Sequence, residues 1–153
     1  MGYRSEVLIA VQMDDHEDEE SIRNWHLFIA ELKADPKCDM AMRDLTNGKN
    51  GEGTNAEEGI DMKNCSLYVR FDDVKWYDTD EWVQSYNRII GKASHYCEDN
   101  KFGMSACFLR VGEETNDVVE ECYGAYGYDL AYISTPYIET TDVKFDPDNK
   151  LTQ

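Results

Sequence analysis

The segment from Cys65 to Ala93, CSLYVRFDDVKWYDTDEWVQSYNRIIGKA, contains the clearest strand pattern and the clearest helix pattern in the chain. In its first part Leu67, Val69 and Phe71 alternate with more polar residues, and Asp72-Asp73 then interrupts the apolar run. A period of two is typical of a strand that buries one face. The sequence therefore predicts a strand that ends near the two aspartates and is followed by a polar turn.

The second part of the stretch predicts a helix. Asp78 is the expected N-cap, with Glu81 completing a capping box, and Tyr77 and Trp82 stand where a hydrophobic staple forms. Gly91 is expected to kink or end this helix. The apolar stripe recurs at helical spacing and consists of Trp82, Val83, Tyr86, Ile89, Ile90 and Ala93. Such a stripe has to be buried, and a sheet is the natural surface for it.

The flanking sequence supplies further elements. Tyr3 to Gln12 alternates with apolar residues on both faces, which suits a central strand. A helix carrying Ile22, Trp25, Ile29 and Leu32 should end at Asp35-Pro36. The remaining predictions are a short strand at Met40–Leu45, a loop at Asn47–Gly59, a strand at Met104–Val111, and a hairpin of Val118–Tyr126 with Leu130–Ser134 around Gly127-Tyr128-Asp129.

This order predicts an α+β fold, with two helices packed on one mainly antiparallel sheet. It is compatible with a ferredoxin-like core that carries a C-terminal hairpin. We expect residues 1–135 to form a single domain. Residues 136–153 are expected to be a loosely held acidic tail.

Charge is the most informative feature of the composition. The 153 residues include 32 Asp and Glu but only 15 Lys and Arg, which gives a formal net charge of -17. Nucleic acids and anionic membranes would repel such a chain, so a basic protein partner is favoured. With 41% hydrophobic residues the chain is nevertheless rich enough in apolar side chains to fold.

Other features point to a reducing compartment inside a cell. The 5 cysteines show no C-x-x-C spacing. The apolar run in the opening MGYRSEVLIAVQ is too short for a signal peptide. No segment approaches the ~20 apolar residues that a membrane span needs.

Three patches of the sequence are distinctive together: the opening Met1-Gly2-Tyr3-Arg4-Ser5-Glu6-Val7, the turn Val74-Lys75-Trp76-Tyr77-Asp78, and the strand end Leu109-Arg110-Val111-Gly112-Glu113-Glu114 with the acids that follow it. In these patches the chain resembles uncharacterised small acidic proteins of bacteriophages and prophages. The resemblance implies a phage origin and the cytoplasm of an infected bacterial host. It carries no activity that could be transferred to this chain.

The sequence shows no enzyme signature, so we predict no catalytic residues, no metal and no cofactor. Asp72, Asp73 and Lys75, with Asp61 upstream, imitate the acidic pattern of a metal-dependent nuclease. Similar short elements recur elsewhere in this acidic chain, and the charge would repel a nucleic-acid substrate. A metal-dependent enzyme therefore stays a distant alternative.

The acids themselves are the candidate partner-binding residues, because they gather next to predicted helix starts and strand ends. They are Asp14, Asp15, Glu17, Asp18, Glu19, Glu20, Asp72, Asp73, Asp78, Asp80, Glu81, Glu113, Glu114, Asp117, Glu120 and Glu121. Rigidly placed carboxylates can imitate the phosphates of a DNA duplex. We therefore expect an acidic inhibitor of the anti-restriction or anti-CRISPR type, which binds the basic nucleic-acid-binding surface of a host defence or DNA-handling protein.

Another interpretation of the acids remains open. The charge can serve only to keep the surface solvated. In that case a phage accessory protein would bind a host or phage protein through aromatic residues, and formation of a homo-oligomer stays open as a separate alternative. The tyrosines expected to serve as anchors are Tyr123, Tyr126, Tyr128, Tyr132 and Tyr137.

Overall fold

A computed structural model of the chain describes residues 2–47, 54–114, 116–134 and 137–152, with only the backbone of residues 54–56. The strands are β1 (Ser5–Met13), β2 (Thr54–Asp61), β3 (Ser66–Val74), β4 (Met104–Gly112), β5 (Val118–Tyr123), β6 (Ala131–Ser134) and β7 (Tyr137–Thr140). The α-helices are α1 (Glu19–Ala34), α2 (Asp39–Asn47), α3 (Glu81–Cys97) and α4 (Gly127–Leu130). The α+β fold predicted from the sequence is confirmed.

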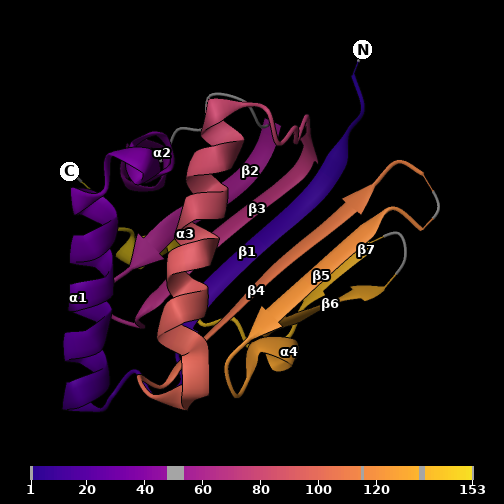
Figure 1. Ribbon diagram of the computed structural model, residues 1–153. Coiled ribbons are helices and arrows are strands. Elements are labelled where there is room, and N and C mark those ends of the chain that lie inside the picture. Colours follow the sequence, from indigo (N-terminus) through magenta and orange to yellow (C-terminus); the bar gives the residue numbers. More distant parts are fainter. Residues whose placement is uncertain (1, 48–53, 115, 135–136, 153) are drawn as a thin grey trace.

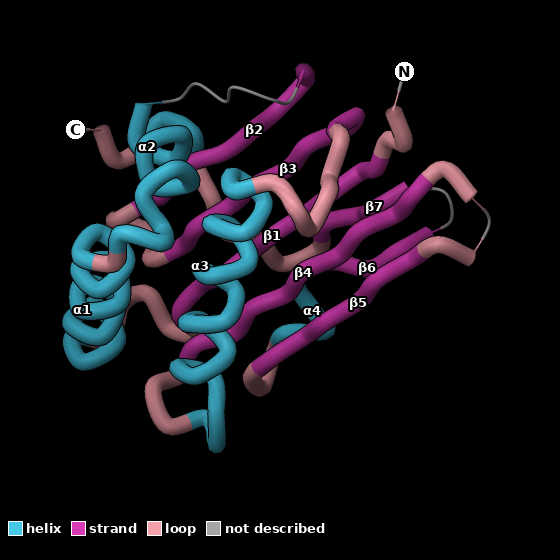
Figure 2. Tube along the Cα trace, turned by 45° about the horizontal axis from the view of Figure 1, so that its top comes forward, coloured by secondary structure: helices cyan, strands magenta, loops and turns pink. Residues whose placement is uncertain are grey.

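Five of the strands form one antiparallel sheet in the order β2-β3-β1-β4-β5, as Figure 1 and Figure 2 show. Its first four strands, with α1 and α3 as the crossovers, follow the βαββαβ ferredoxin-like pattern. The fifth strand, β5, extends this core beside β4 and forms one edge of the sheet. The strands β6 and β7 pair only with each other, as a separate hairpin.

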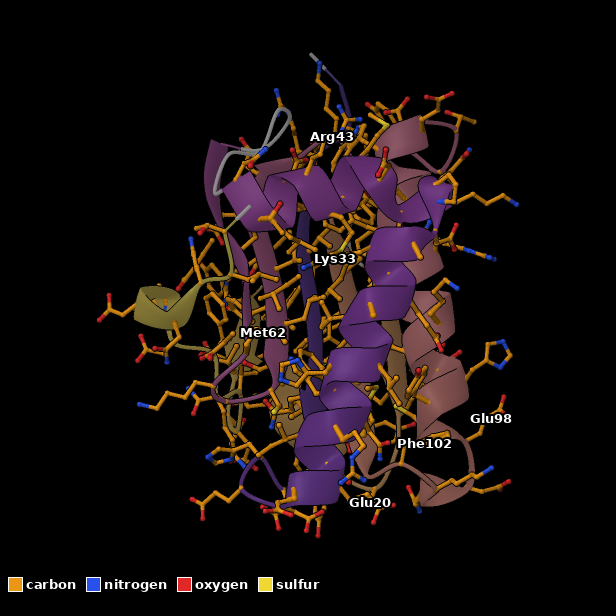
Figure 3. All side chains as sticks on the ribbon, turned by 90° about the vertical axis from the view of Figure 1, so that its left-hand side faces the viewer. Glu20, Lys33, Arg43, Met62, Glu98 and Phe102 are labelled. Carbon is orange, nitrogen blue, oxygen red and sulfur yellow. The ribbon has the colours of Figure 1, made fainter. Side chains whose placement is uncertain are left out.

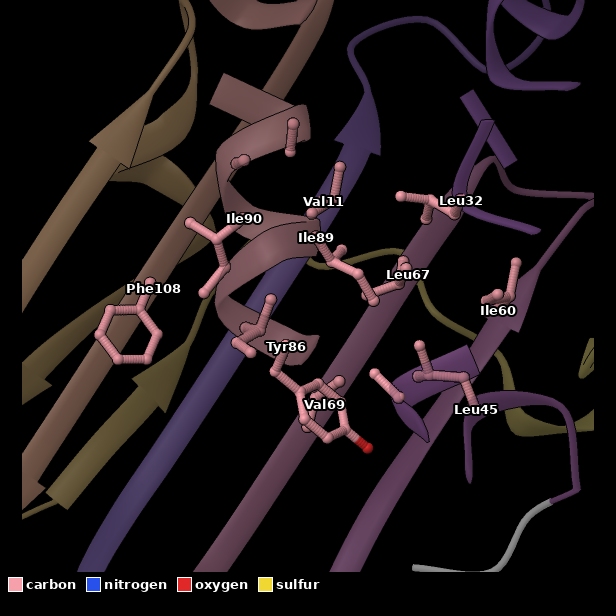
Figure 4. Close-up of a cluster of buried hydrophobic side chains, with 14 of the residues drawn as sticks. Val11, Leu32, Leu45, Ile60, Leu67, Val69, Tyr86, Ile89, Ile90 and Phe108 are labelled. Carbon is pink, nitrogen blue, oxygen red and sulfur yellow. The ribbon is translucent and has the colours of Figure 1, made fainter. Parts of the chain in front are cut away.

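One face of the sheet packs against α1 and α3. Val11 of β1, Leu67 of β3 and Ile89 of α3 lie in a single buried cluster, which Figure 4 shows together with Tyr86 and Phe108. The predicted stripe of α3 is buried along its whole length. The packing of helix α3 on the sheet therefore follows from the apolar periodicities of the strand and the helix between Cys65 and Ala93.

The opposite face of the sheet is covered by the C-terminal part of the chain. Ile138 of β7 is buried in a second cluster with Leu8 and Leu109, and Phe145 stacks on Tyr68 with ring centroids 5.5 Å apart. The backbone N–H of Leu151 donates to the Ile60 carbonyl at 2.7 Å. The prediction of a loosely held tail was wrong for residues 137–152, because β1 is apolar on both faces and this segment covers the second one.

The start of α3 differs from the prediction in detail. The N-cap is Asp80 rather than Asp78, and its side chain makes no capping hydrogen bond. A turn in which the Asp80 N–H donates to the Tyr77 carbonyl delays the helix by two residues. Trp76 rather than Tyr77 packs on Trp82, with ring centroids 5.3 Å apart. Gly91 neither kinks nor ends the helix, which continues to Cys97.

Three other element predictions were wrong. Met40–Leu45 belongs to a helix, α2, and not to a strand. The end of the predicted loop is strand β2, which is held by its register with β3, while residues 48–53 lie outside the described residues. The predicted hairpin is also different, because β5 pairs with β4 and residues 127–130 are helical.

Candidate protein-interaction surface

The predicted acids divide between the two ends of the sheet. The upper cluster, where β3 and β4 end and α3 begins, consists of Asp72, Asp73, Asp78, Asp80, Glu81, Glu113, Glu114 and Asp117. The lower cluster, between the end of β1 and the first turn of α1, consists of Asp14, Asp15, Glu17, Asp18, Glu19 and Glu20. Glu120 and Glu121 lie between the two clusters, on the edge strand β5.

The length of β1 sets the distance between the two clusters. This strand runs from Ser5 to Met13, and at about 3.3 Å per residue the two ends of the sheet are roughly 25–30 Å apart. Figure 3 shows Glu20 of α1 at the same lower end as Glu98, just beyond α3. A partner that touches both clusters therefore has to span most of the length of the molecule.

Several members of the lower cluster accept hydrogen bonds from other groups of the protein. Asp18 is the N-cap of α1 and accepts a hydrogen bond from the Ser21 N–H at 3.2 Å. Asp14 accepts one from the Ser105 hydroxyl at 2.6 Å, and burial raises the pKa of its carboxyl. Glu19 and Glu20, in the first turn of α1, are exposed. Their charge is favourable next to the N-terminal end of the helix dipole.

Arginines neutralise part of the upper cluster. Arg70 Nε lies 3.1 Å from Asp72, and Arg110 Nη2 lies 2.7 Å from Asp117. The hydrogen bonds from Arg110, followed by that from Tyr3, lower the pKa of Asp117. Arg4 makes a looser 4.0 Å pair with Asp73. These contacts hold three of the acids close to the protein surface.

The three patches that carry the resemblance to phage proteins come together at this upper end. The Tyr3 hydroxyl accepts a hydrogen bond from the Glu114 N–H at 2.9 Å and donates one to Asp117. A Cβ on Gly112 would overlap with both Tyr3 and Asp117, so the absence of a side chain at Gly112 allows these two residues to meet. Gly2 in turn lies against Tyr77. The patches are therefore parts of one structural junction.

Most of the predicted acidic charge remains unpaired. Within the described part of the chain, Lys or Arg forms ion pairs with Asp72, Asp73 and Asp117 alone among the sixteen predicted acids. All sixteen except Asp14, Asp80 and Asp117 are exposed. The surface thus offers many solvated carboxylates that a basic partner could neutralise.

The structure does not bring together the acids that imitate the pattern of a metal-dependent nuclease. Asp61 lies at the lower end of β2, opposite Ser66, whereas Asp72 and Asp73 lie at the upper end of β3. Asp61 accepts hydrogen bonds from the N–H groups of Asn64 and Asp146 at 2.9 and 3.0 Å. Its side chain therefore holds the β2–β3 turn and the C-terminal segment together. The described residues contain no group of His, Cys, Asp and Glu side chains that could hold a metal ion.

Two surface features were not predicted from the sequence. A groove of about 400 Å³ lies between α3 and β5, and a larger cleft of about 810 Å³ lies between α2 and α3. The groove contains Trp76, Phe108 and Tyr123 beside two acids of the predicted set, Asp78 and Glu121. No sequence signal reveals it, because it forms only when β5 pairs with β4 beyond the edge of α3.

The predicted tyrosine anchors are mostly exposed. Tyr132 and Tyr137 are 51% and 62% exposed on the outward face of the β6–β7 hairpin, and Tyr126 and Tyr128 lie next to it at α4. Tyr123 is partly buried in the groove instead. Tyr126 lines a pocket with Asp14 of the lower cluster, and Tyr123 shares the groove with Asp78 of the upper cluster, so the tyrosines adjoin both acidic clusters.

None of the helices formed by the described residues is long and apolar enough to cross a membrane. Comparison with known proteins gave no match. No family model fits the chain, and no curated protein or solved structure is significantly similar to it.

Proposed function

We propose that this chain is a phage-encoded acidic inhibitor that occupies the basic nucleic-acid-binding surface of a host defence or DNA-handling protein. The observation that carries the proposal is the set of exposed, largely unpaired carboxylates on β5 and at both ends of the sheet, where they lie in turns or in the adjoining ends of helices and strands. Fixed carboxylates can replace phosphates without a large loss of conformational entropy on binding. The phage origin rests on the three patches that meet at the upper end.

The amount of charge fits this role. Duplex DNA carries one charge per about 1.7 Å, so a segment of roughly 25–30 Å carries about 16 phosphates. The whole protein has a formal net charge of -17. Self-repulsion of this charge destabilises a compact fold. A use for the charge in binding would explain why the chain tolerates that cost.

Retention of a partner by the immobilised protein tests the proposal. A nucleic-acid-binding protein captured from a bacterial lysate should be released as salt is raised from about 50 to 200 mM, because its contacts are electrostatic. Duplex DNA in excess should also displace the captured protein. Simultaneous binding of DNA and inhibitor at low salt would reject occupancy of the nucleic-acid site.

The tyrosines favour a second candidate function. Four of the five predicted anchors are exposed near the β6–β7 hairpin, and exposed tyrosines are common anchors of protein interfaces. A partner bound there would respond little to salt and would not compete with DNA. Replacement of Tyr132 and Tyr137 by serine would abolish such binding, while neutralising the acidic clusters would leave it unchanged.

A further inference from the structure

The outer edge of β5 carries unpaired backbone groups. The Gly112 N–H donates to the Asp117 carbonyl at 2.8 Å, which makes these two residues a hydrogen-bonded pair of the ladder between β4 and β5. Hydrogen-bonded and non-hydrogen-bonded pairs alternate in an antiparallel ladder. It follows from the register that Val118, Glu120 and Cys122 direct their N–H and C=O groups away from β4. Among the described strands, only β4 pairs with β5.

The groove runs beside this edge on the helix-covered face of the sheet. Val119 and Tyr123 of β5 line it together with Ile90 of α3 and Phe108 of β4. Figure 4 shows Ile90 and Phe108 on the same side of the core cluster. In Figure 1 the strand β5 lies beyond α3, so neither α1 nor α3 covers this strip of the sheet. Asp78, Arg110 and Glu121 also line the groove, so a strand added to β5 would direct alternate side chains into a groove with both apolar and charged walls.

The charges on β5 indicate which kind of segment could pair with its outer edge. Glu120 and Glu121 are adjacent, exposed and central in β5, and they point to opposite faces of the sheet. If a second copy paired with β5, the two two-fold registers with the greatest overlap would place either Glu120 opposite the second copy's Glu120 or Glu121 opposite its Glu121. Like charges in either position are destabilising. A segment with lysine or arginine opposite the two glutamates is favoured instead.

We propose that β5 binds an extended basic segment of a partner protein, which adds as a sixth strand of the sheet and places apolar side chains in the α3–β5 groove. Main-chain hydrogen bonds to Val118, Glu120 and Cys122 provide affinity, and Glu120 and Glu121 provide selectivity for cationic side chains. The inference rests on the proposed function for its choice of a basic partner. It adds that the partner docks through backbone pairing at one edge.

A synthetic peptide tests this inference without the natural partner. The probe is a short labelled peptide with two adjacent central lysines flanked by valines, and its binding to the full chain is measured at low salt. Glu120→Gln with Glu121→Gln should weaken binding about fivefold, from two cross-strand charge pairs. Methylating the peptide nitrogens that face β5 should weaken it about tenfold, because ladder hydrogen bonds are lost.

The matched control is Glu98→Gln with Asp99→Asn, two adjacent exposed acids outside the predicted binding set, which removes the same charge and should leave peptide affinity within about twofold. Equal weakening by both double variants, or no effect of methylation, would show non-specific attraction and overturn the inference. Circular dichroism confirms that the variants stay folded. Failure of the peptide to bind would reject the edge pairing but not the DNA mimicry. Failure of DNA to compete for a captured partner would reject the mimicry but not the edge pairing.

Discussion

The Tyr86 hydroxyl of α3 donates a 2.8 Å hydrogen bond to Glu58 Oε2 of β2, and both side chains are buried. The other carboxyl oxygen, Glu58 Oε1, has no hydrogen-bond partner among the described residues. Burial raises the pKa of Glu58 to about 7, the Tyr86 hydrogen bond and Lys150 oppose this rise, and Asp44 adds to it. The edge strand β2 is thus attached to α3 by a carboxyl group that takes up a proton near neutral pH.

This carboxyl should make stability depend on pH. A folded-state pKa of about 7 lies above the reference value of 4.5, so the folded protein binds the extra proton between these two pH values. Stability conferred by protonated Glu58 is therefore present below about pH 4.5 and is lost as pH rises through 7, by up to about 3 kcal/mol. Glu58→Gln keeps an acceptor for Tyr86 and should remove this loss. Denaturant melts at pH 5 and 8 measure it, and equal pH dependence of both proteins would contradict the prediction.

Trp82 should be among the most important residues of the helix-side core. It is 9% exposed and packs on Phe71, Trp76 and Tyr86 with ring centroids 5.3–6.1 Å apart. Trp82→Ala should lower the free energy of unfolding by about 3–5 kcal/mol. Leu27→Ala, at a residue that is 55% exposed, is the control and should change it by less than about 0.5 kcal/mol. A loss below about 1 kcal/mol for Trp82→Ala would show that the packing of α3 does not depend on this ring.

The elements that could be predicted are those in which the apolar pattern of the segment itself determines the secondary structure. The strand from Ser66 and the helix through Tyr86 each carry a complete apolar face, and β1 is apolar on both faces. The helix α2 was missed because it is short, although Ala41 and Leu45 are buried at helical spacing. The edge strand β2 was missed because it carries acids and glycine, and its register with β3 decides its structure.

The candidate surface could be predicted only in part. Most acids are expected at the surface because of their charge, but the burial of Glu58 and Asp61 and the division of the exposed acids between two ends depend on the fold. The roles of Asp18 as a cap and Asp117 as the partner of Arg110 depend on tertiary contacts. The open edge of β5 was also beyond prediction, since the sequence suggested that this strand would pair with the following one.

Cys107 and Cys122 should be the cysteine pair most easily joined by oxidation. They face each other at a non-hydrogen-bonded position of the ladder, where Cα atoms are about 4.5 Å apart and a disulfide is sterically allowed. Burial raises the pKa of Cys107 to about 12 and that of Cys122 to about 11, so the reaction should need alkaline pH. Oxidised glutathione would accept two electrons and leave as two thiols. Mass spectrometry of an unreduced digest should find this cross-link, and glutathione attached to Cys122 without a cross-link would contradict the prediction.

The two acidic clusters should both contribute to binding if the protein replaces a duplex. Two variants with matched losses of charge test this: Asp15→Asn, Glu17→Gln, Glu19→Gln and Glu20→Gln at the lower end, and Asp78→Asn, Glu81→Gln, Glu113→Gln and Glu114→Gln at the upper end. Both sets leave unchanged the N-cap residues Asp18 and Asp80 and the arginine-paired Asp117. The fold should therefore be preserved in both variants.

A basic channel that holds roughly eight base pairs of duplex is long enough to contact both clusters, because they are about 25–30 Å apart. Each variant should then weaken retention of the captured partner about tenfold or more at low salt, and the difference from the unchanged protein should shrink as salt is raised. Loss of binding in only one variant would assign the interface to that end and reject a footprint along the whole molecule. Unchanged retention in both variants would show that the acidic clusters do not contribute to binding and would favour an interface at the tyrosines near the β6–β7 hairpin.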